Sequence, residues 1–369
     1  MELTIINHTG WKKVYLKLLN HQRKSTYLLL NFNEKSATVD INLDKFKYAY
    51  LTDKKHQTDI IILHENLSII ELNYVRKIKA YTASLRVKGE DDYGYVETYL
   101  LQDEKNLSYR KKAEKKIHVL LPKNYHKDKK YGLIIMFDGQ NLFNQNKINH
   151  YTNRNDPYGS WQIETSLSQL NKLYPEEEYL VVGIENADKY RELELSMGSA
   201  FGDFPEGISE DEFTKIGYLD MLDDFINETL LPFIFNKYPI NQNNIGISGA
   251  SCGGTACHYI GLKNHQKYQF ILCFTPASGF YCDESWKAFY QKLNLKKQTN
   301  LPLFYYFQGK HGWLERLLTK LNSNLVNNLL ENGYPNQLIH TYIEPKANHN
   351  ELAWRYGFAY GILERKKRH

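Results

Sequence analysis

The stretch NNIGISGASCGGTACHYIGL, residues 243–262, decides the fold. It joins a β-rich run to a helix-like segment through Gly249, Ser251 and Gly253, which spell G-x-S-x-G. A serine on such a sharp turn is raised clear of the backbone, and the two glycines remove side chains that would collide with the turn. The start of the following helix offers free N–H groups and positive potential to a developing oxyanion. The pattern therefore predicts Ser251 as a nucleophile.

The sequence around this stretch alternates between β-rich runs and helical patterns from about residue 93 onward. Several of the runs are continuously apolar, as expected for strands that are covered on both faces. Alternation of this kind indicates a mostly parallel sheet with helices on both sides. The expected strands are 117–122, 132–137, 179–184, 243–248, 269–274, 301–307 and 337–343, and a helix is expected over 218–235.

The first 88 residues follow a different pattern of short alternating runs at 14–19, 26–32, 48–51 and 59–63, separated by polar turns. This spacing predicts an antiparallel sandwich. The acidic, glycine-bounded GEDDYG at 89–94 is the expected boundary, which gives a β-rich domain over 1–92 and an α/β domain over 93–369. We interpret the aromatic residues of the first domain as core, with an exposed sugar-binding set as the alternative: Trp11, Tyr15, Tyr27, Tyr48 and Tyr50.

Composition excludes several classes of protein. With 369 residues, of which 42% are hydrophobic, the chain can bury a large core, so a disordered chain is excluded. A net charge of +5 does not suit a dedicated nucleic-acid binder. The start lacks a secretory pattern, and no apolar run is long enough to span a bilayer, so we expect a soluble cytoplasmic protein with reduced cysteines. Cys252, Cys257, Cys273 and Cys282 lack the close paired spacing of a zinc site.

A serine nucleophile needs a base, which in this architecture follows the last strand. His349 occupies that place, whereas His258 and His311 are interpreted as structural or exposed. The acid that orients the histidine should follow the penultimate strand. Only Glu315 lies there, and a Ser-His dyad, or an acid from elsewhere such as Asp283 or Glu284, stays open.

The oxyanion of an acyl-transfer reaction needs two donors. One is expected from the backbone N–H of Cys252, directly after the nucleophile. The second should come from the loop FDGQNLF, 137–143, where Gly139 lets the backbone turn closely and leaves the N–H of Gln140 as the candidate. No glycine-rich phosphate loop of the P-loop type is present, so no nucleotide cofactor is expected.

These residues resemble the putative esterase family of α/β-hydrolases, which contains S-formylglutathione hydrolases, feruloyl and acetylxylan esterases, and siderophore esterases. The matching motifs occur in family order across about 93–369: VLLPKNY 119–125, FDGQNLF 137–143, GSWQIETSL 159–167, VVGIENADKYREL 181–193, GASCGG 249–254 and HNELAW 349–354. The resemblance implies an α/β-hydrolase fold, with Ser251 and His349 in catalysis and Cys252 and Gln140 in the oxyanion hole. It also implies substrate contacts from Arg191 and Trp161.

One feature departs from the family pattern. Members commonly carry Glu or Asp three residues after a glycine that follows the penultimate strand, but Gly309 is followed at that spacing by Gly312. The resemblance implies a serine esterase without a cofactor that acts on a small ester, with a siderophore trilactone as the first choice. An acetyl or feruloyl carbohydrate esterase and a non-catalytic binding protein are the alternatives. Two roles stay open for the N-terminal domain, as a wall of the pocket or as a homodimer interface. Neither a nucleic-acid nor a membrane partner is expected.

Overall fold

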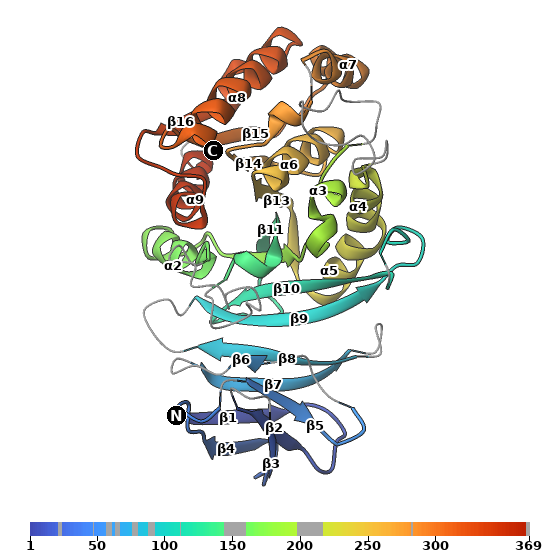
Figure 1. Ribbon diagram of the computed structural model, residues 1–369, viewed down its shortest axis with the longest axis vertical. Helices are drawn as coiled ribbons and strands as arrows, with labels where there is room; N and C mark the ends of the chain where they lie inside the picture. Colours follow the sequence, from blue (N-terminus) through green and yellow to red (C-terminus); the bar gives the residue numbers. More distant parts are fainter. Residues whose placement is uncertain are drawn as a thin grey trace.

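The computed structural model of the chain describes residues 1–20, 24–46, 48–56, 61–62, 67–75, 80–87, 93–110, 112–143, 160–197, 217–281 and 283–366. Within these residues, one sheet of 12 strands runs in the order β16-β15-β14-β13-β11-β12-β10-β9-β8-β7-β1-β4. A second sheet has four strands in the order β3-β2-β5-β6. In Figure 1 the helices gather around one end of the large sheet and the N-terminal strands form the other end.

The helix-covered end of the sheet is mostly parallel. From β16 to β12 every neighbouring pair is parallel, and β10 and β9 continue the sheet in antiparallel pairing. The strands are β9 (Gly94–Gln102), β10 (Glu114–Pro122), β11 (Tyr131–Phe137), β12 (Tyr179–Ile184), β13 (Ile240–Ala250), β14 (Phe270–Phe274), β15 (Leu303–Gly309) and β16 (Ile339–Glu344). The carboxyl ends of the six parallel strands therefore meet at one edge, where ligands bind in open α/β sheets.

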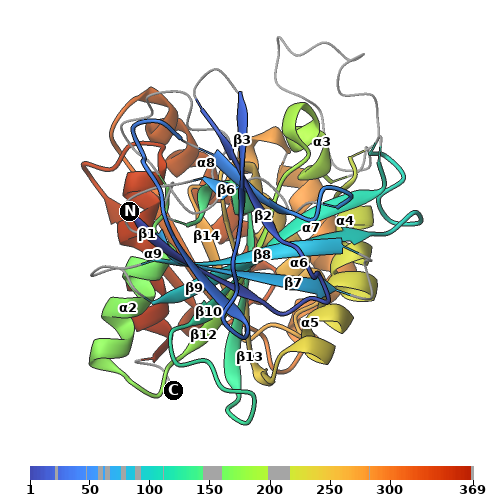
Figure 2. The same cartoon turned by 90° about the horizontal axis from the view of Figure 1, so that it is seen from below.

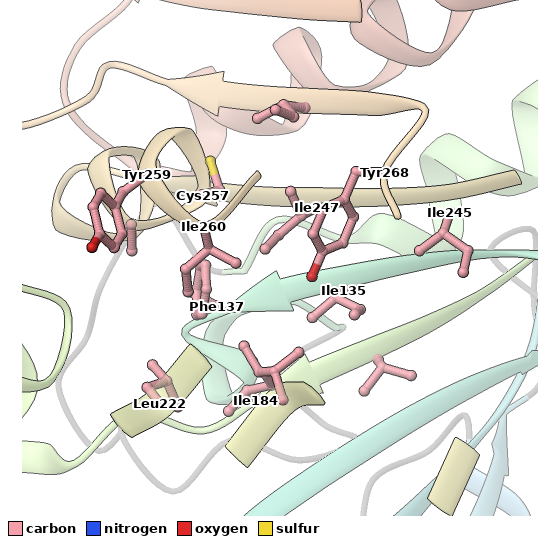
Figure 3. Packing of buried hydrophobic residues seen from close by; sticks show 14 of the residues in the cluster. Ile135, Phe137, Ile184, Leu222, Ile245, Ile247, Cys257, Tyr259, Ile260 and Tyr268 are labelled. Atoms are coloured by element: carbon pink, nitrogen blue, oxygen red, sulfur yellow. The ribbon is translucent and has the colours of Figure 1, made fainter. Parts of the chain in front are cut away.

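Helices cover both faces of these strands. Along β11, Leu133, Ile135 and Phe137 enter one buried cluster, and Ile134 and Met136 enter the other. Figure 3 shows part of the first cluster, in which Phe137 of β11 lies near Ile260. This cluster includes residues of α4 (Leu219–Phe225), η5 (Ile226–Leu230), α5 (Leu231–Lys237), α6 (Cys252–Lys263), α7 (Asp283–Leu293) and α8 (Trp313–Glu331). The second includes residues of α2 (Ile163–Leu173) and α9 (Glu351–Lys366). The predicted α/β class is confirmed.

The predicted helix over 218–235 is present, with one irregular stretch in its middle. Residues 226–230 form a π-helical turn between α4 and α5. Pro232 lies in the first turn of α5. A proline lacks the N–H that would bond to the carbonyl of the preceding turn and its ring crowds that carbonyl, so the wider π turn accommodates it without ending the helix.

The N-terminal unit is a sandwich, as expected, with one parallel pair. Strands β1 (Glu2–Asn7), β4 (Ser36–Asp40), β7 (Leu67–Val75) and β8 (Ala80–Val87) belong to the large sheet, and β1 pairs in parallel with β7. The smaller sheet holds β2 (Tyr15–Leu19), β3 (Ser25–Leu29), β5 (Tyr48–Thr52) and β6 (Ile61–Ile62), all antiparallel. Leu3, Ile5, Leu16 and Leu51 pack between the two sheets. Figure 2 shows these strands from below, with the helices behind them.

The large sheet continues across the expected domain boundary. β8 pairs with β9 through Leu85 opposite Val96 and Arg86 opposite Tyr95. The sandwich and the α/β unit therefore share one sheet, which the sequence did not indicate. The division at 92/93 stays a prediction, and residues 89–92 of the expected boundary GEDDYG lie outside the described residues.

The interpretation of the N-terminal aromatics as core is corrected for three of them. On β2, Leu16 and Leu18 point inward, so Tyr15 lies on the outer face, and Tyr27 and Tyr50 lie on the same face opposite Lys17. Tyr27 is 47% exposed, and the ammonium of Lys17 lies 5.8 and 5.6 Å from the ring centres of Tyr27 and Tyr50. Trp11 does pack against the sandwich core, and the side chain of Tyr48 is outside the described part.

Helix α6, which follows the predicted nucleophile, is fixed by a buried histidine. His258 bonds to the hydroxyl of Tyr306 through Nδ1 and to that of Tyr290 through Nε2, both at 2.8 Å. Burial lowers the pKa of His258 to about 3, so the ring is neutral at ordinary pH. His258 is structural, as expected. In the described part of the chain, no helix has the length and apolar character needed to cross a membrane.

Candidate active site

Ser251 lies at the sharp turn between β13 and α6 that the G-x-S-x-G pattern predicts. Its backbone has φ 56° and ψ −124°, a conformation that costs a non-glycine residue strain energy. Two hydrogen bonds to the next strand region hold it there: the Ser251 N–H donates to the carbonyl of Phe274 at 2.9 Å, and the Ala277 N–H donates to the carbonyl of Ser251 at 3.1 Å. The strain is thus offset by bonds to the end of β14.

The two glycines of the motif are required by close backbone contact. A Cβ on Gly249 would lie 2.5 Å from the carbonyl oxygen of Gly253. A Cβ on Gly253 would lie 3.2 Å from the Cβ of Phe137 and 3.3 Å from a carboxylate oxygen of Asp138. Larger residues would therefore push α6 away from β13 and from the end of β11.

His349 and Glu315 meet at the same edge of the sheet. His349 follows β16 and Glu315 follows β15, and the Nδ1 atom of His349 lies 2.8 Å from Oε1 of Glu315. The histidine side chain is 19% exposed and the glutamate is fully buried. Because a carboxylate only accepts, Nδ1 carries the proton in this contact and Nε2 keeps its lone pair. The pair can take up a proton through Nε2.

Glu315 is in the first turn of α8, three residues beyond the place where the family carries its acid. Gly312 precedes the helix with φ 84°. From the helix, the Glu315 carboxylate turns back so that Oε2 accepts the N–H of Gly309 at 2.9 Å while Oε1 contacts His349. A Cβ on Gly309 would lie 2.8 Å from Oε2 of Glu315 and 2.4 Å from the carbonyl of Ala347. Gly309 therefore has to be a glycine for the acid to reach the strand end.

The alternative acids have no described side chains. Asp283 begins α7, but its side chain and that of Glu284 lie outside the described part of the chain. Cys252, Cys257 and Cys273 are free thiols in the structure, and Cys282 is not among the described residues. Among the residues that are described, no cluster of three His, Cys, Asp or Glu side chains could hold a metal ion.

A row of aromatic rings connects His349 to Phe274, the last residue of β14, whose carbonyl accepts the Ser251 N–H. The His349 ring meets Trp354 edge-on at 5.0 Å, Trp354 lies 5.6 Å from Trp161, and Trp161 meets Phe274 edge-on at 4.8 Å. Trp161 is 3% exposed. It therefore packs among the aromatic residues behind the site, and the substrate contact implied for it stays a prediction.

The two expected oxyanion donors lie at the starts of short helical segments. Cys252 is the first residue of α6 and Gln140 lies in η1 (Gly139–Asn141), so neither N–H has a partner within its own helical segment. Gly139 approaches β12 so closely that a Cβ would lie 2.6 Å from the carbonyl carbon of Gly183. The side chain of Gln140 is fixed as well, because its Oε1 accepts the N–H of Asn186 at 3.3 Å.

Arg191 braces this loop through Asp138, a residue that the sequence analysis did not single out. Its Nε and Nη2 atoms lie 2.6 and 2.7 Å from the two carboxylate oxygens of Asp138, and Asn186 donates to the same carboxylate at 2.7 Å. Burial would raise the pKa of Asp138, but the Arg191 guanidinium and these hydrogen bonds hold it below its usual value. A charged residue directly after a buried strand needs a partner of opposite charge or a hydrogen-bond donor. The position of Asp138 after 132–137 could therefore have indicated such a partner.

The short helix that carries Arg191 is itself anchored by a buried ion pair. Glu194 ends α3 (Arg191–Glu194) and contacts Lys115 of β10, and both side chains are almost fully buried. Tyr109 donates to Glu194 at 2.7 Å. Burial lowers the pKa of Lys115 to about 8, although the charge of Glu194 opposes this shift. The buried ion pair thus fixes the short helix that carries Arg191, which suits a supporting role of Arg191 toward Asp138.

Comparison with known proteins places the chain among hydrolases. A family model described as "Putative esterase" matches residues 108–302, just over half of the chain. Glu315 and His349 lie beyond the matched segment. No curated protein matches the sequence.

Solved structures with similar folds include the siderophore hydrolase EstA from Aspergillus nidulans, at 15% identity and a TM-score of 0.55 over 74% of this chain and 94% of EstA. An IroE-like serine hydrolase from Shewanella oneidensis is similar at 14% identity and a TM-score of 0.51, over 73% of this chain and 79% of that one. These likenesses show the fold, and the expected α/β-hydrolase fold is confirmed.

The contact between Gly309 and Glu315 predicts a specific loss of stability. We expect Gly309→Ala to lower the free energy of unfolding by about 1–3 kcal/mol, because the added Cβ overpacks the strand end. Gly10→Ala is the matched control, since a Cβ there meets nothing within 4 Å, and its effect should stay below about 1 kcal/mol. Urea unfolding measures both. Equal effects of the two substitutions would contradict the close approach of the acid to the backbone.

Proposed function

Because the chain belongs to the putative esterase family, we propose that it is a serine esterase that hydrolyses a carboxylic ester through an acyl-enzyme. Ser251 is the nucleophile, His349 the general base and Glu315 the acid that orients it. The observation that carries the proposal is the contact of 2.8 Å between His349 and Glu315 at the sheet edge where the strained Ser251 turn ends β13.

In the first half of the reaction, Oγ of Ser251 attacks the ester carbonyl carbon while Nε2 of His349 takes the hydroxyl proton. The resulting imidazolium is stabilised by the Glu315 carboxylate, which accepts from Nδ1. The carbon–oxygen bond to the alcohol then breaks, and His349 returns the proton to the departing alkoxide. The acyl group stays on Ser251.

In the second half, a water molecule gives its proton to His349 and attacks the acyl carbon, and the carboxylic acid leaves as Ser251 recovers its proton. Both tetrahedral intermediates carry negative charge on the former carbonyl oxygen. The N–H groups of Cys252 and Gln140 are the proposed donors to it, and the start of α6 adds its positive potential. The bond network of Asp138 and Arg191 supports the Gln140 loop.

The proposed nucleophile predicts a labelling pattern. A fluorophosphonate probe should label the wild-type protein once, with the label mapped to the peptide that contains Ser251. Ser251→Ala should abolish labelling and His349→Ala should slow it by at least about 10²-fold, because the hydroxyl then lacks its base. His126→Ala, an exposed histidine remote from the site in sequence, is the control and should label normally. A folded wild-type protein that takes no label would overturn the serine mechanism in favour of a binding protein.

The role of the acid has a separate prediction. Glu315→Gln should lower kcat for a small ester by about 10²–10⁴-fold, because an amide in place of the carboxylate removes the charge that stabilises the imidazolium. Glu331→Gln, an exposed glutamate at the end of the same helix, is the matched control. Unchanged turnover in the Glu315 variant would show that Ser251 and His349 work as a dyad.

As the substrate we propose a siderophore trilactone. The support is the similarity in fold to EstA, which is described as a siderophore hydrolase, and the net charge of +5, which suits an anionic ferric catecholate. A carbohydrate ester is the second candidate. It is favoured by the outward-facing Tyr15, Tyr27 and Tyr50 of the N-terminal sandwich, since exposed tyrosine rings can stack on sugars.

The substrate proposal is tested by hydrolysis assays followed by mass spectrometry. A catecholate trilactone should be converted to its linear products, and Ser251→Ala should leave it intact. A feruloylated xylo-oligosaccharide and a short acyl ester run in parallel. Turnover of the sugar ester with an intact trilactone would favour the second candidate and contradict the first.

A further inference from the structure

A hollow of about 430 Å³ opens beside His349, and the proposed mechanism assigns it no role. Its walls come from the start of α8 and from the loop before α9, and they include His311, Gly312, Trp313, Asn348 and His349. The volume is within the range of small-molecule sites. Figure 1 shows α8 and α9 at the same end of the sheet, near β15 and β16.

Trp313 is the unusual residue of this hollow. It begins α8 and is 71% exposed, and Leu317, one turn further along the helix, is 45% exposed. Single exposed apolar side chains are common on protein surfaces, but this mostly exposed indole lines a hollow that also contains His349. An exposed indole in a concave site offers a flat face to a ligand ring.

The mechanism indicates which part of an ester would reach the hollow. His349 returns its proton to the departing alkoxide, so the alcohol half of the ester has to lie against the imidazole. His349 is one wall of the hollow. We therefore infer that the hollow is the subsite for the alcohol half of the substrate, and that Trp313 stacks on a ring carried by that alcohol. This inference rests on the proposed function.

Polar groups around the indole suit a ring that carries hydroxyl groups. His311 and Asn348 both line the hollow and bond to each other, with Nδ1 of His311 at 2.7 Å from Oδ1 of Asn348. Since the amide oxygen accepts, Nδ1 of His311 donates, and the amide N–H groups of Asn348 are donors by type. An aromatic face beside amide and imidazole groups is the chemistry that recognises a hydroxylated ring.

The position of the acid contributes to this subsite. A Cβ on Gly312 would lie 3.7 Å from Oδ1 of Asn348, so an acid at position 312 would project among the residues that line the hollow. With the acid at Glu315 instead, buried behind His349, position 312 carries no side chain. Gly312 therefore leaves space in the hollow that an acid at this position would occupy.

The first experiment compares acetate esters that share an acyl group and differ in the alcohol: ethyl acetate, 2-phenylethyl acetate and an acetylated methyl xyloside. Trp313→Ala should lower kcat/KM for the ring-bearing esters by up to about tenfold, the fold-change that corresponds to a ring stacking energy of about 0.5–1.5 kcal/mol. Ethyl acetate should be unaffected, and Trp313→Phe should restore most of the loss. The two ring-bearing esters show whether the alcohol is an aryl or a sugar type.

Tyr360→Ala is the matched control, since Tyr360 is an exposed aromatic residue of α9 that stacks on Tyr342 and does not line the hollow. Equal losses for all three esters in Trp313→Ala would show a structural role and overturn the inference. No loss for either ring-bearing ester would overturn it as well.

A second measurement does not depend on turnover. The indole N–H resonance of Trp313, identified by its loss in Trp313→Phe, is followed by NMR in the Ser251→Ala protein as 2-phenylethanol or methyl xyloside is added. A saturable shift of that resonance with one alcohol supports the subsite even if no ester is hydrolysed. Absence of a shift with both alcohols overturns the subsite, whether or not the serine mechanism holds.

Discussion

The backbone of Ser251 is the constraint on which the rest of the site depends. A serine with φ 56° is held in place because its N–H and its carbonyl both bond to the segment that ends β14. That arrangement requires β14 beside β13, glycines on both sides of the serine and a helix that starts at once. The core packing of α6, including its neutral histidine between two tyrosines, keeps the helix from rotating away from the turn.

The groups around Ser251 are positioned in a different way. Their side chains reach from one element to the end of another. Glu315 reaches back from α8 to the last residue of β15, and Asp138 follows β11 and binds an arginine from α3. In both cases a buried carboxylate accepts hydrogen bonds from donors of another element. Each such bond ties a loop or helix start to the carboxyl edge of the sheet.

The parts of this protein that local patterns determine were predictable from the sequence. The apolar run 179–184, for example, is a strand with the predicted ends, because a strand covered on both faces is continuously apolar and is easily recognised in the sequence. Glu315 could be named as a candidate acid, with a dyad or another acid left open, since it is the one carboxylate in the segment QGKHGWLER after the run 301–307. The turn of its side chain toward Gly309 could not be predicted, because it depends on where α8 begins relative to β15.

Contacts between residues that are far apart in the sequence could not be predicted for the same reason. The pair of Arg191 and Asp138 joins residues 53 positions apart, and Trp161 became a packing residue only because Trp354 and Phe274 flank it in three dimensions. The outward tyrosines of β2, β3 and β5 follow from strand alternation, yet which face is the core depends on the second sheet. The pairing of β8 with β9 likewise could not be predicted from the sequence.

The pairing of β8 with β9 gives the N-terminal strands a structural role at the edge of the large sheet. In a hydrolase sheet that ended at β9, this nine-residue strand would expose a row of unpaired amide and carbonyl groups, a template for strand pairing between molecules. Here β8 covers part of that row, and the sheet instead ends at the five-residue β4. Short terminal strands offer a poor template. The sandwich therefore covers part of an edge that the α/β unit alone would leave open.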